Sequence, residues 1–331
     1  MQPIFPPKLK AGDHVRVIAP ARSMAILSKE TRQIALSRFE ELGLKVSFGK
    51  HVEECDEFNS SSIEHRLEDL HEAFSDPSVN AILTVIGGFN SNQLLKYIDY
   101  DLIRKNPKIL CGYSDITALQ NAIFAKTGLV TYSGPHFSTF GMKQRFEFTS
   151  SHFKKCLFEE GPFELKPSEF WSDDPWYIDQ NKREFIPNPG YTVINPGRAQ
   201  GRIVGGNIGT LGLLRGTEFM PSLKDSILFV EDDEMPGALT DVVFDRDLQA
   251  MIHLPDFSGV KAIVIGRFQK ASKMTVDKIR KIVSTKRELK DIPIVYGVDF
   301  GHTDPYITFP IGGLAELEAD GENVKIRILE H

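Results

Sequence analysis

The sequence predicts an α/β fold with two domains, and three observations support this prediction. Up to about residue 135, short apolar runs alternate with amphipathic stretches of helical period, a pattern typical of parallel strands joined by helical crossovers. The same alternation resumes after about residue 200. The chain of 331 residues also exceeds the usual size of a single domain.

The N-terminal elements follow one another in regular alternation. We expect strands over 14–20, 45–50, 81–88, 108–113 and 129–135, and helices over 26–44, 62–76, 92–106 and from Ser114 onward. Ligands of parallel sheets bind beyond the carboxyl ends of the strands. Segments 19–21, 87–88 and 112–114 fall at those ends, so we expect them to meet in one crevice.

Residues from about 142 to 200 lose this rhythm and are rich in Pro, Trp, Asp and Asn. We interpret them as a long connector with an ordered loop, a kind of segment that often carries function. Beyond it we expect strands over 202–207, 226–231, 260–266, 292–298, 307–309, 314–318 and 324–329, and helices over 207–216, 238–253 and 275–289. The predicted divisions are an N-terminal domain over 1–150, a connector over 151–200 and a C-terminal domain over 201–331.

Charge and composition exclude several classes of partner. Lysine and arginine number 39 against 45 acidic residues, the net charge is −6, and no long basic run occurs, which argues against nucleic acid and anionic membranes. No apolar stretch approaches membrane-spanning length, and the first residues lack the layout of a secretory signal. We therefore expect a cytoplasmic protein. Three isolated cysteines without ligand spacing predict neither a disulfide nor a zinc site.

The segment 106–118, NPKILCGYSDITA, reads as a buried strand that runs through a glycine turn into a helix, with Ser114 at the bend. Such a turn exposes a nucleophilic hydroxyl and aims the next residue's N–H at the reacting carbonyl. A serine before a helix is also an ordinary N-cap, and Ile116 departs from the GxSxG pattern, which argues against a standard α/β-hydrolase. Cys111 reads as a thiol in the strand core.

A nucleophilic serine needs a base, and nine histidines are available. His302 follows a predicted strand in the turn 301–305, where a strand-end loop aims side chains into a cleft, and we favour it over His136. Surface positions on helical patterns or at the chain end are expected for His65, His71, His152 and His331, and unremarkable settings for His14, His51 and His253.

The orienting carboxylate is predicted at Glu231, which ends an apolar strand and precedes Asp232, Asp233 and Glu234. An acidic cluster can also bind magnesium or calcium, but these residues are consecutive rather than spaced as ligands. The glycine-rich segments at 87–92 and 205–209 each precede a helix, and N–H groups there suit an oxyanion or a phosphate. Neither matches a GxGxxG or P-loop motif, and tight backbone turns are the alternative for both.

The only tryptophans, Trp171 and Trp176, lie in the polar connector. Indoles near a cleft can stack on a planar ligand such as a nucleobase, and burial at the domain seam is the alternative.

Segments 87–135, 205–211, 228–234 and 297–305, in this order, resemble the LD-carboxypeptidase family of serine peptidases over most of the chain. The connector sequence EFWSDDPWYID over 169–179 is similar to the microcin C self-immunity (MccF-like) branch rather than to the muropeptide-recycling branch.

This resemblance implies a Rossmann- or flavodoxin-like N-terminal domain, a smaller swivelling C-terminal domain, a homodimer, and no metal or cofactor. It implies a catalytic Ser114, His302 and Glu231, and an oxyanion hole from the amides of Gly88 and Asp115. It further implies substrate-binding roles for Asn90, Trp171 and Trp176, and a structural role for His136.

The implied reaction is hydrolysis of an amide bond in a peptidyl or aminoacyl nucleotide of the microcin C type. The alternative substrate is a muropeptide, whose terminal D-alanine is released by cleavage of an L-to-D amide. A different class of function is a non-catalytic sensor that binds a ligand in the interdomain cleft.

Overall fold

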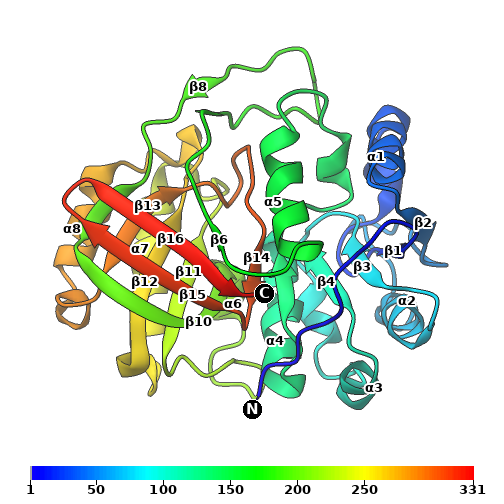
Figure 1. The fold of residues 1–331 in the computed structure, drawn as a ribbon, viewed down its shortest axis with the longest axis horizontal. Coiled ribbons are helices and arrows are strands. Elements are labelled where there is room, and N and C mark those ends of the chain that lie inside the picture. Colours follow the sequence, from blue (N-terminus) through cyan, green and yellow to red (C-terminus); the bar gives the residue numbers. More distant parts are fainter. Residues whose placement is uncertain (1) are drawn as a thin grey trace.

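The computed structural model describes residues 2–331, which form two large sheets and one small sheet (Figure 1). The first sheet comes mainly from the N-terminal part of the chain, as do its helices, and the second sheet comes mainly from residues after 190. The sheets lie side by side, and α4 (Thr117–Thr127) packs against the second one at β10 and α6. This arrangement confirms the predicted α/β class.

The first sheet contains five parallel strands in the order 2-1-3-4-5, which is the flavodoxin-like order. Its strands are β1 (His14–Ile18), β2 (Lys45–Phe48), β3 (Ala81–Thr84), β4 (Ile109–Gly112) and β5 (Thr131–Ser133), with β14 (Phe309–Ile311) antiparallel at the edge beside β5. β3 and β4 are buried along their whole length, as expected for strands that are covered on both faces.

Helices cover both faces of this sheet and build two separate cores. On one face, α1 (Lys29–Glu41) and α5 (Glu147–Leu157) pack around Phe39 and Phe153. On the other face, α2 (Ile63–Ser75), α3 (Tyr100–Lys105) and α4 pack around residues such as Leu70 and Leu119. A ligand site is expected at the carboxyl ends of these strands.

The second sheet has the order β6-β16-β15-β10-β11-β12-β13-β9. Its parallel centre is β10 (Gly197–Asn207), β11 (Ser226–Glu231), β12 (Val260–Gly266) and β13 (Ile294–Val298), and its antiparallel flanks are β9 (Thr192–Asn195), β15 (Leu314–Asp320), β16 (Asn323–Glu330) and β6 (Phe163–Glu164). The helices of this part are α6 (Ile208–Gly212), α7 (Thr240–Ile252) and α8 (Val276–Ser284), and β7 (Phe170–Trp171) pairs with β8 (Ile186–Pro187).

The structure differs from the sequence-based expectations in three places. The expected helix over 92–106 is a 3₁₀ turn (Ser91–Leu94) followed by α3, because the Asp99 carboxylate accepts the N–H of Leu102 at 2.9 Å and starts a new helix. The connector contributes β6 and β9 to the second sheet. The expected strand near 307–309 is β14, which joins the first sheet. The boundaries at 150 and 200 stay a prediction.

The two sheets are joined by direct hydrogen bonds between α4 and the end of β10. The Asn121 amide donates to the carbonyl of Gly205 at 2.8 Å, and its oxygen accepts the N–H of Gly205 at 3.3 Å. Thr117 Oγ1 accepts the N–H of Asn207 at 3.0 Å. A Cβ on Gly206 would lie 2.3 Å from Thr117 Oγ1, so only glycine permits this approach. The first turn of α4 is thereby fixed to β10.

No helix within residues 2–331 combines the length and the apolar character needed to cross a membrane.

Candidate active site

Ser114 lies at a sharp bend between β4 and α4 and has a φ of +61°. A residue other than glycine in this left-handed region is strained, and such strain is typical of a nucleophile elbow. Two residues earlier, a Cβ on Gly112 would lie 2.2 Å from Thr84 Oγ1, so the turn has no room for a side chain there. The local sequence therefore forces the Ser114 hydroxyl out of the backbone at the carboxyl end of the sheet.

His302 connects this hydroxyl to a carboxylate from the second sheet. Its Nε2 lies 3.0 Å from Ser114 Oγ, and its Nδ1 lies 2.8 Å from Oε2 of Glu231. Glu231 is the last residue of β11 and is buried, and His302 stands in the turn after β13. The structure thus brings together the three residues that the sequence singled out as nucleophile, base and orienting acid.

The acidic surroundings control the protonation of His302. Burial by itself would lower the pKa of the imidazole, but the charge and hydrogen bond of Glu231, with the charges of Asp233 and Asp232, raise it to about 9. Burial, together with the charges of Glu231 and Asp233, raises the pKa of Asp232 to about 7. The site therefore stabilises an imidazolium, the species that a general base becomes when it takes a proton.

The glycine turn at 87–91 is held against the elbow by Asp115. The carboxylate of Asp115 accepts the N–H groups of Asn90 at 3.1 Å and Ser91 at 2.9 Å, and the Ser91 hydroxyl donates to the Asp115 carbonyl at 2.7 Å. A Cβ on Gly87 would lie 3.1 Å from Ser114 Oγ and 3.6 Å from the Asp115 nitrogen. The turn backbone is therefore next to the nucleophile.

Gly88, which the resemblance suggests as an oxyanion donor, follows directly in this turn. A Cβ on Gly88 would lie 3.0 Å from the Ala21 side chain and 3.2 Å from the Arg22 nitrogen. Arg22 in turn donates to the carbonyl of Gly87 at 3.1 Å through Nε. The segment after β1 therefore supports the back of the turn, as expected if the strand ends meet.

His136, the competing histidine, does not contact Ser114 in the described hydrogen bonds. Its Nδ1 lies 2.7 Å from Thr84 Oγ1, and its ring packs on Tyr113 with 4.3 Å between centroids. Burial and the positive charge of Arg22 lower its pKa well below the usual value, so the ring stays neutral. It supports the bend at Ser114 through its hydrogen bond with Thr84 and its packing on Tyr113.

The connector reaches the active site beside His302. Ser172 of the connector exchanges two backbone hydrogen bonds, of 2.8 and 2.7 Å, with Asp304. Asp304 lies only two residues after His302 in the sequence. The Arg267 guanidinium lies 5.2 Å from the ring centre of Trp171. Trp176 is half-buried against the core formed with α1 and α5. Trp171 is therefore nearer to the second domain and Trp176 nearer to the first.

A cavity of about 340 Å³ lies next to the glycine turn. It is lined by Arg22, Asp56, Phe58, Ser61, Ser62, Ile63, Arg66, Phe89, Asn90 and Gln93. Asn90 Oδ1 is buried without a hydrogen-bond partner among the described residues. Arg66, which no sequence pattern marks as a site residue, donates to Asn90 O at 3.1 Å and to Gln93 Oε1 at 2.6 Å. An arginine in an amphipathic helix gives no signal that distinguishes it from a surface residue.

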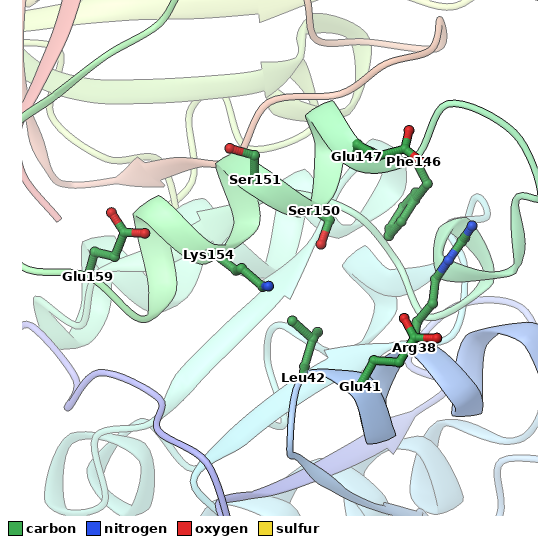
Figure 2. A pocket seen from close by; sticks show the side chains of 9 residues that line it. All are labelled: Arg38, Glu41, Leu42, Phe146, Glu147, Ser150, Ser151, Lys154 and Glu159. Carbon is green, nitrogen blue, oxygen red and sulfur yellow. The ribbon is translucent and has the colours of Figure 1, made fainter.

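A second cavity, of about 460 Å³, lies between α1 and α5 (Figure 2). Its lining, Arg38, Glu41, Leu42, Phe146, Glu147, Ser150, Ser151, Lys154 and Glu159, contains none of the predicted site residues. The Arg38 guanidinium lies 4.2 Å from the Phe146 ring centre and donates to Phe140 O at 2.7 Å. This cavity therefore lies away from the residues singled out by the sequence, and the candidate site is the one at Ser114.

Comparison with known proteins identifies two matching family domains. Residues 15–134 match the LD-carboxypeptidase N-terminal domain, and residues 200–317 match the LD-carboxypeptidase C-terminal domain. The chain is 54% identical to the putative carboxypeptidase YocD of Bacillus subtilis over 329 residues, 99% of this chain and 100% of that protein. It is 31% identical to the microcin C7 self-immunity protein MccF of Escherichia coli, covering 98% and 96% of the two chains.

The relatives also include a probable murein peptide carboxypeptidase of Bacillus subtilis, 35% identical over 94% of this chain and 91% of that protein. Among solved structures, an MccF-like protein from Bacillus anthracis strain Ames superposes with a TM-score of 0.98 at 55% identity, covering 99% and 100% of the two chains. The complex of MccF with glutamyl sulfamoyl guanosine gives a TM-score of 0.88 at 30% identity, covering 99% of each chain. This chain belongs to the LD-carboxypeptidase family of serine peptidases.

Proposed function

We propose that Ser114, His302 and Glu231 are the catalytic triad of this serine peptidase, and that its substrate is a peptidyl or aminoacyl nucleotide of the microcin C type. The observation that carries the catalytic part is the continuous contact from Ser114 Oγ through the His302 ring to Glu231, with distances of 3.0 and 2.8 Å. A hydroxyl, an imidazole and a buried carboxylate in this order are the parts of a serine hydrolase.

In the proposed mechanism, His302 Nε2 takes the proton from Ser114 as Oγ attacks the carbonyl carbon of the scissile amide. The N–H groups of Gly88 and Asp115 stabilise the oxyanion of the tetrahedral intermediate. His302 then protonates the leaving nitrogen, and the acyl group remains on Ser114. Water, activated by the same imidazole, hydrolyses this ester and restores the serine. Glu231 stays ionised and holds the imidazole in the required tautomer.

The nucleotide part of the proposal rests on the connector. It carries both tryptophans of the chain, and its Ser172–Asp304 pairing sets it beside the turn of His302. An indole offers a flat face on which a base can stack. Solved complexes of the relative MccF contain glutamyl sulfamoyl guanosine and aspartyl sulfamoyl adenosine. We assign Trp171 or Trp176 to base stacking, and Asn90, with its unpartnered oxygen, to substrate binding.

The second candidate substrate is a murein tetrapeptide, from which the same acyl transfer would release D-alanine. The similarity to a probable murein peptide carboxypeptidase favours it as much as the similarity to MccF favours the nucleotide. The third hypothesis, a non-catalytic sensor, is disfavoured by membership of a peptidase family. Substrate chemistry is therefore the question that an experiment has to answer.

The test offers the pure protein one aminoacyl sulfamoyl adenosine and one murein tetrapeptide, together in one reaction, and follows both by mass spectrometry. We expect release of the free amino acid and sulfamoyl adenosine, with the tetrapeptide consumed at least about ten times more slowly. The Ser114→Ala variant serves as the control for contaminating hydrolases. Preferential loss of D-alanine from the tetrapeptide would contradict the nucleotide assignment and leave the triad intact.

We also propose that the enzyme is a cytoplasmic homodimer, as the family resemblance and the sequence composition suggest. Light scattering coupled to size-exclusion chromatography measures the assembly, and fractionation of the producing cells measures the location. A monomeric mass at micromolar concentration would contradict the dimer.

A further inference from the structure

Two histidines that the sequence placed in ordinary settings lie together at the surface of the first domain. His51 stands in the segment between β2 and α2, and His65 stands in the first turn of α2. Their rings stack with 3.9 Å between centroids and 11° between planes. Nδ1 of His51 lies 2.7 Å from one carboxylate oxygen of Glu54, and Nδ1 of His65 lies 2.6 Å from the other.

We propose that His51, Glu54 and His65 bind one divalent first-row transition-metal ion, with zinc as the reference ion. One ligand atom from each residue lies within 4.8 Å of the others, so a single ion can contact all three. Two imidazole nitrogens and one carboxylate oxygen suit zinc and its neighbours better than magnesium or calcium, which prefer oxygen ligands. With three protein ligands, one position would be left for water.

The required movement is small. Ligand bonds of about 2.0–2.1 Å in a tetrahedral zinc site place ligand atoms roughly 3.3–3.4 Å apart. The three ligand atoms now lie within 4.8 Å of one another, so none of their separations has to change by more than about 1.5 Å. In the absence of a metal, a proton on Nδ1 lets each ring donate to the Glu54 carboxylate. An entering ion would displace those protons to solvent, because a metal-bound imidazole nitrogen must be unprotonated.

The surroundings of His51 orient its ring for a metal. Its Nε2 lies 3.1 Å from a carboxylate oxygen of Glu68, so that a proton on Nε2 leaves the lone pair of Nδ1 facing Glu54 and His65. A carboxylate on the far nitrogen is the usual support of a metal-binding histidine. The Asp69 carboxylate accepts the backbone N–H of His51 at 3.1 Å and fixes the main chain there.

The three proposed ligand side chains differ in their exposure to solvent, and this difference would let an ion enter and leave the site. The His51 side chain is only 8% exposed, whereas the side chains of Glu54 and His65 are each 43% exposed. An ion would therefore bind against a rigid histidine and enter from the side of the two others. Binding would also tie the segment that carries Asp56 and Phe58, two walls of the cavity beside the glycine turn, to the start of α2.

The test is titration of the metal-free protein with Zn²⁺ alone in a calorimeter and with Co²⁺ alone in a spectrophotometer. We expect one ion to bind per chain, and we expect the visible absorption of bound Co²⁺ to be that of an ion with a low coordination number. His65→Ala and Glu54→Gln should weaken binding by at least about 100-fold, and Glu68→Gln by about 10- to 100-fold. His253→Ala, at an exposed histidine whose ring contacts Gln249, and Cys55→Ser, at an exposed thiol next to the site, should leave the affinity unchanged.

Thermal unfolding gives a second readout that does not depend on catalysis. Zn²⁺ should raise the melting temperature of the wild type and of Cys55→Ser, but not that of Glu54→Gln, whose exposed side chain leaves the fold intact. The proposal is overturned if the wild type binds no Zn²⁺ at about 0.1 mM. It is equally overturned if Glu54→Gln and His65→Ala bind as the wild type does, or if Cys55→Ser alone abolishes binding.

Discussion

His302 Nε2 lies 3.0 Å from Ser114 Oγ, although 188 positions separate the two residues in the sequence. Ser114 follows a strand of the first sheet, and His302 follows a strand of the second. Their contact requires that the two sheets keep a fixed relation, and the bonds of Asn121 and Thr117 to the end of β10 supply it. The following predictions test this geometry and the chemistry proposed for it.

Replacing Glu231 by Gln should change the pH dependence of catalysis. His302 must be neutral to accept a proton, and its pKa of about 9 means that kcat/KM of the wild type should rise from about pH 7 and level off above about pH 9. Glu231→Gln removes the charge that raises this pKa, so the acidic limb of the profile should move to lower pH. At its own optimum this variant should lose about 10⁴-fold in kcat, less than His302→Ala.

Asp233→Asn is the matched control for this pH experiment. Asp233 also raises the pKa of His302 through its charge, while the carboxylate of Glu231 accepts the hydrogen bond that Nδ1 of His302 donates. We expect a smaller shift of the acidic limb in the same direction, with kcat within about threefold of the wild type. An acidic limb that stays in place in both variants would contradict the assignment of His302 as the titrating base.

Asn121→Ala should lower both stability and activity. The substitution leaves the N–H and C=O of Gly205 buried without the side-chain amide that now pairs with them, which costs about 2–5 kcal/mol in the free energy of unfolding. Loss of this link should also reduce kcat, because α4 follows Ser114 directly and β10 pairs in register with β11 up to Glu231. Denaturant unfolding and steady-state kinetics measure the two effects. Asn181→Ala, at an exposed connector position, should change neither.

Gly87→Ala should impair the chemical step while leaving the fold intact. The new methyl group would lie 3.0 Å from Cβ and 3.1 Å from Oγ of Ser114, in the space where the substrate carbonyl must approach. We expect a fall in kcat of at least about 10²-fold, the size of the loss when an oxyanion donor is removed. The control is Gly209→Ala, whose Cβ would be 3.4 Å from Asn207 Oδ1, an ordinary contact. Equal activity of Gly87→Ala and the wild type would show that the carbonyl approaches from another side.

Replacing Trp171 and Trp176 by Ala, singly and together, should weaken hydrolysis of an aminoacyl nucleotide selectively. Loss of one stacking partner costs about 1–3 kcal/mol per base, which corresponds to about 5- to 150-fold in kcat/KM. Hydrolysis of a small acyl ester that lacks a base should fall by less than about threefold in the same variant. Equal losses on both substrates would indicate that the tryptophans support the loop rather than the base.

Much of the first domain, and the placement of Ser114, Glu231 and His302 at strand ends, could be predicted from the sequence, because strand ends of a parallel sheet meet at one edge. The elbow at Ser114, the strand-end acid at Glu231 and the turn at His302 each follow from local pattern. The pairing of β14 with β5 in the first sheet could not be predicted, because the sequence of a three-residue strand does not indicate which strand it pairs with. Pairing of short strands is decided by tertiary packing.

The hydrogen bonds that hold the two sheets together also could not be predicted from the sequence. Asn121 lies on a helix with no unusual pattern, and its role depends on the approach of Gly205 from 84 residues away. The glycine pattern at 205 and 206 leaves open an anion-binding turn or a tight backbone turn, and the structure shows close backbone contact with Phe229 and Thr117. The stacking of His51 on His65 also could not be predicted, because it depends on how α2 packs in the folded chain.

If Ser114 and His302 act as one catalytic unit, their effects on kcat should not add, and a comparison of the single and double variants measures this. Ser114→Ala and His302→Ala should each lose about 10⁴-fold or more, with circular dichroism and melting temperature close to those of the wild type. The double variant should be no slower than either single variant, because removing one member already disables the other. If the two losses instead multiply, or if Ser114→Ala retains substantial turnover, the proposed triad is contradicted.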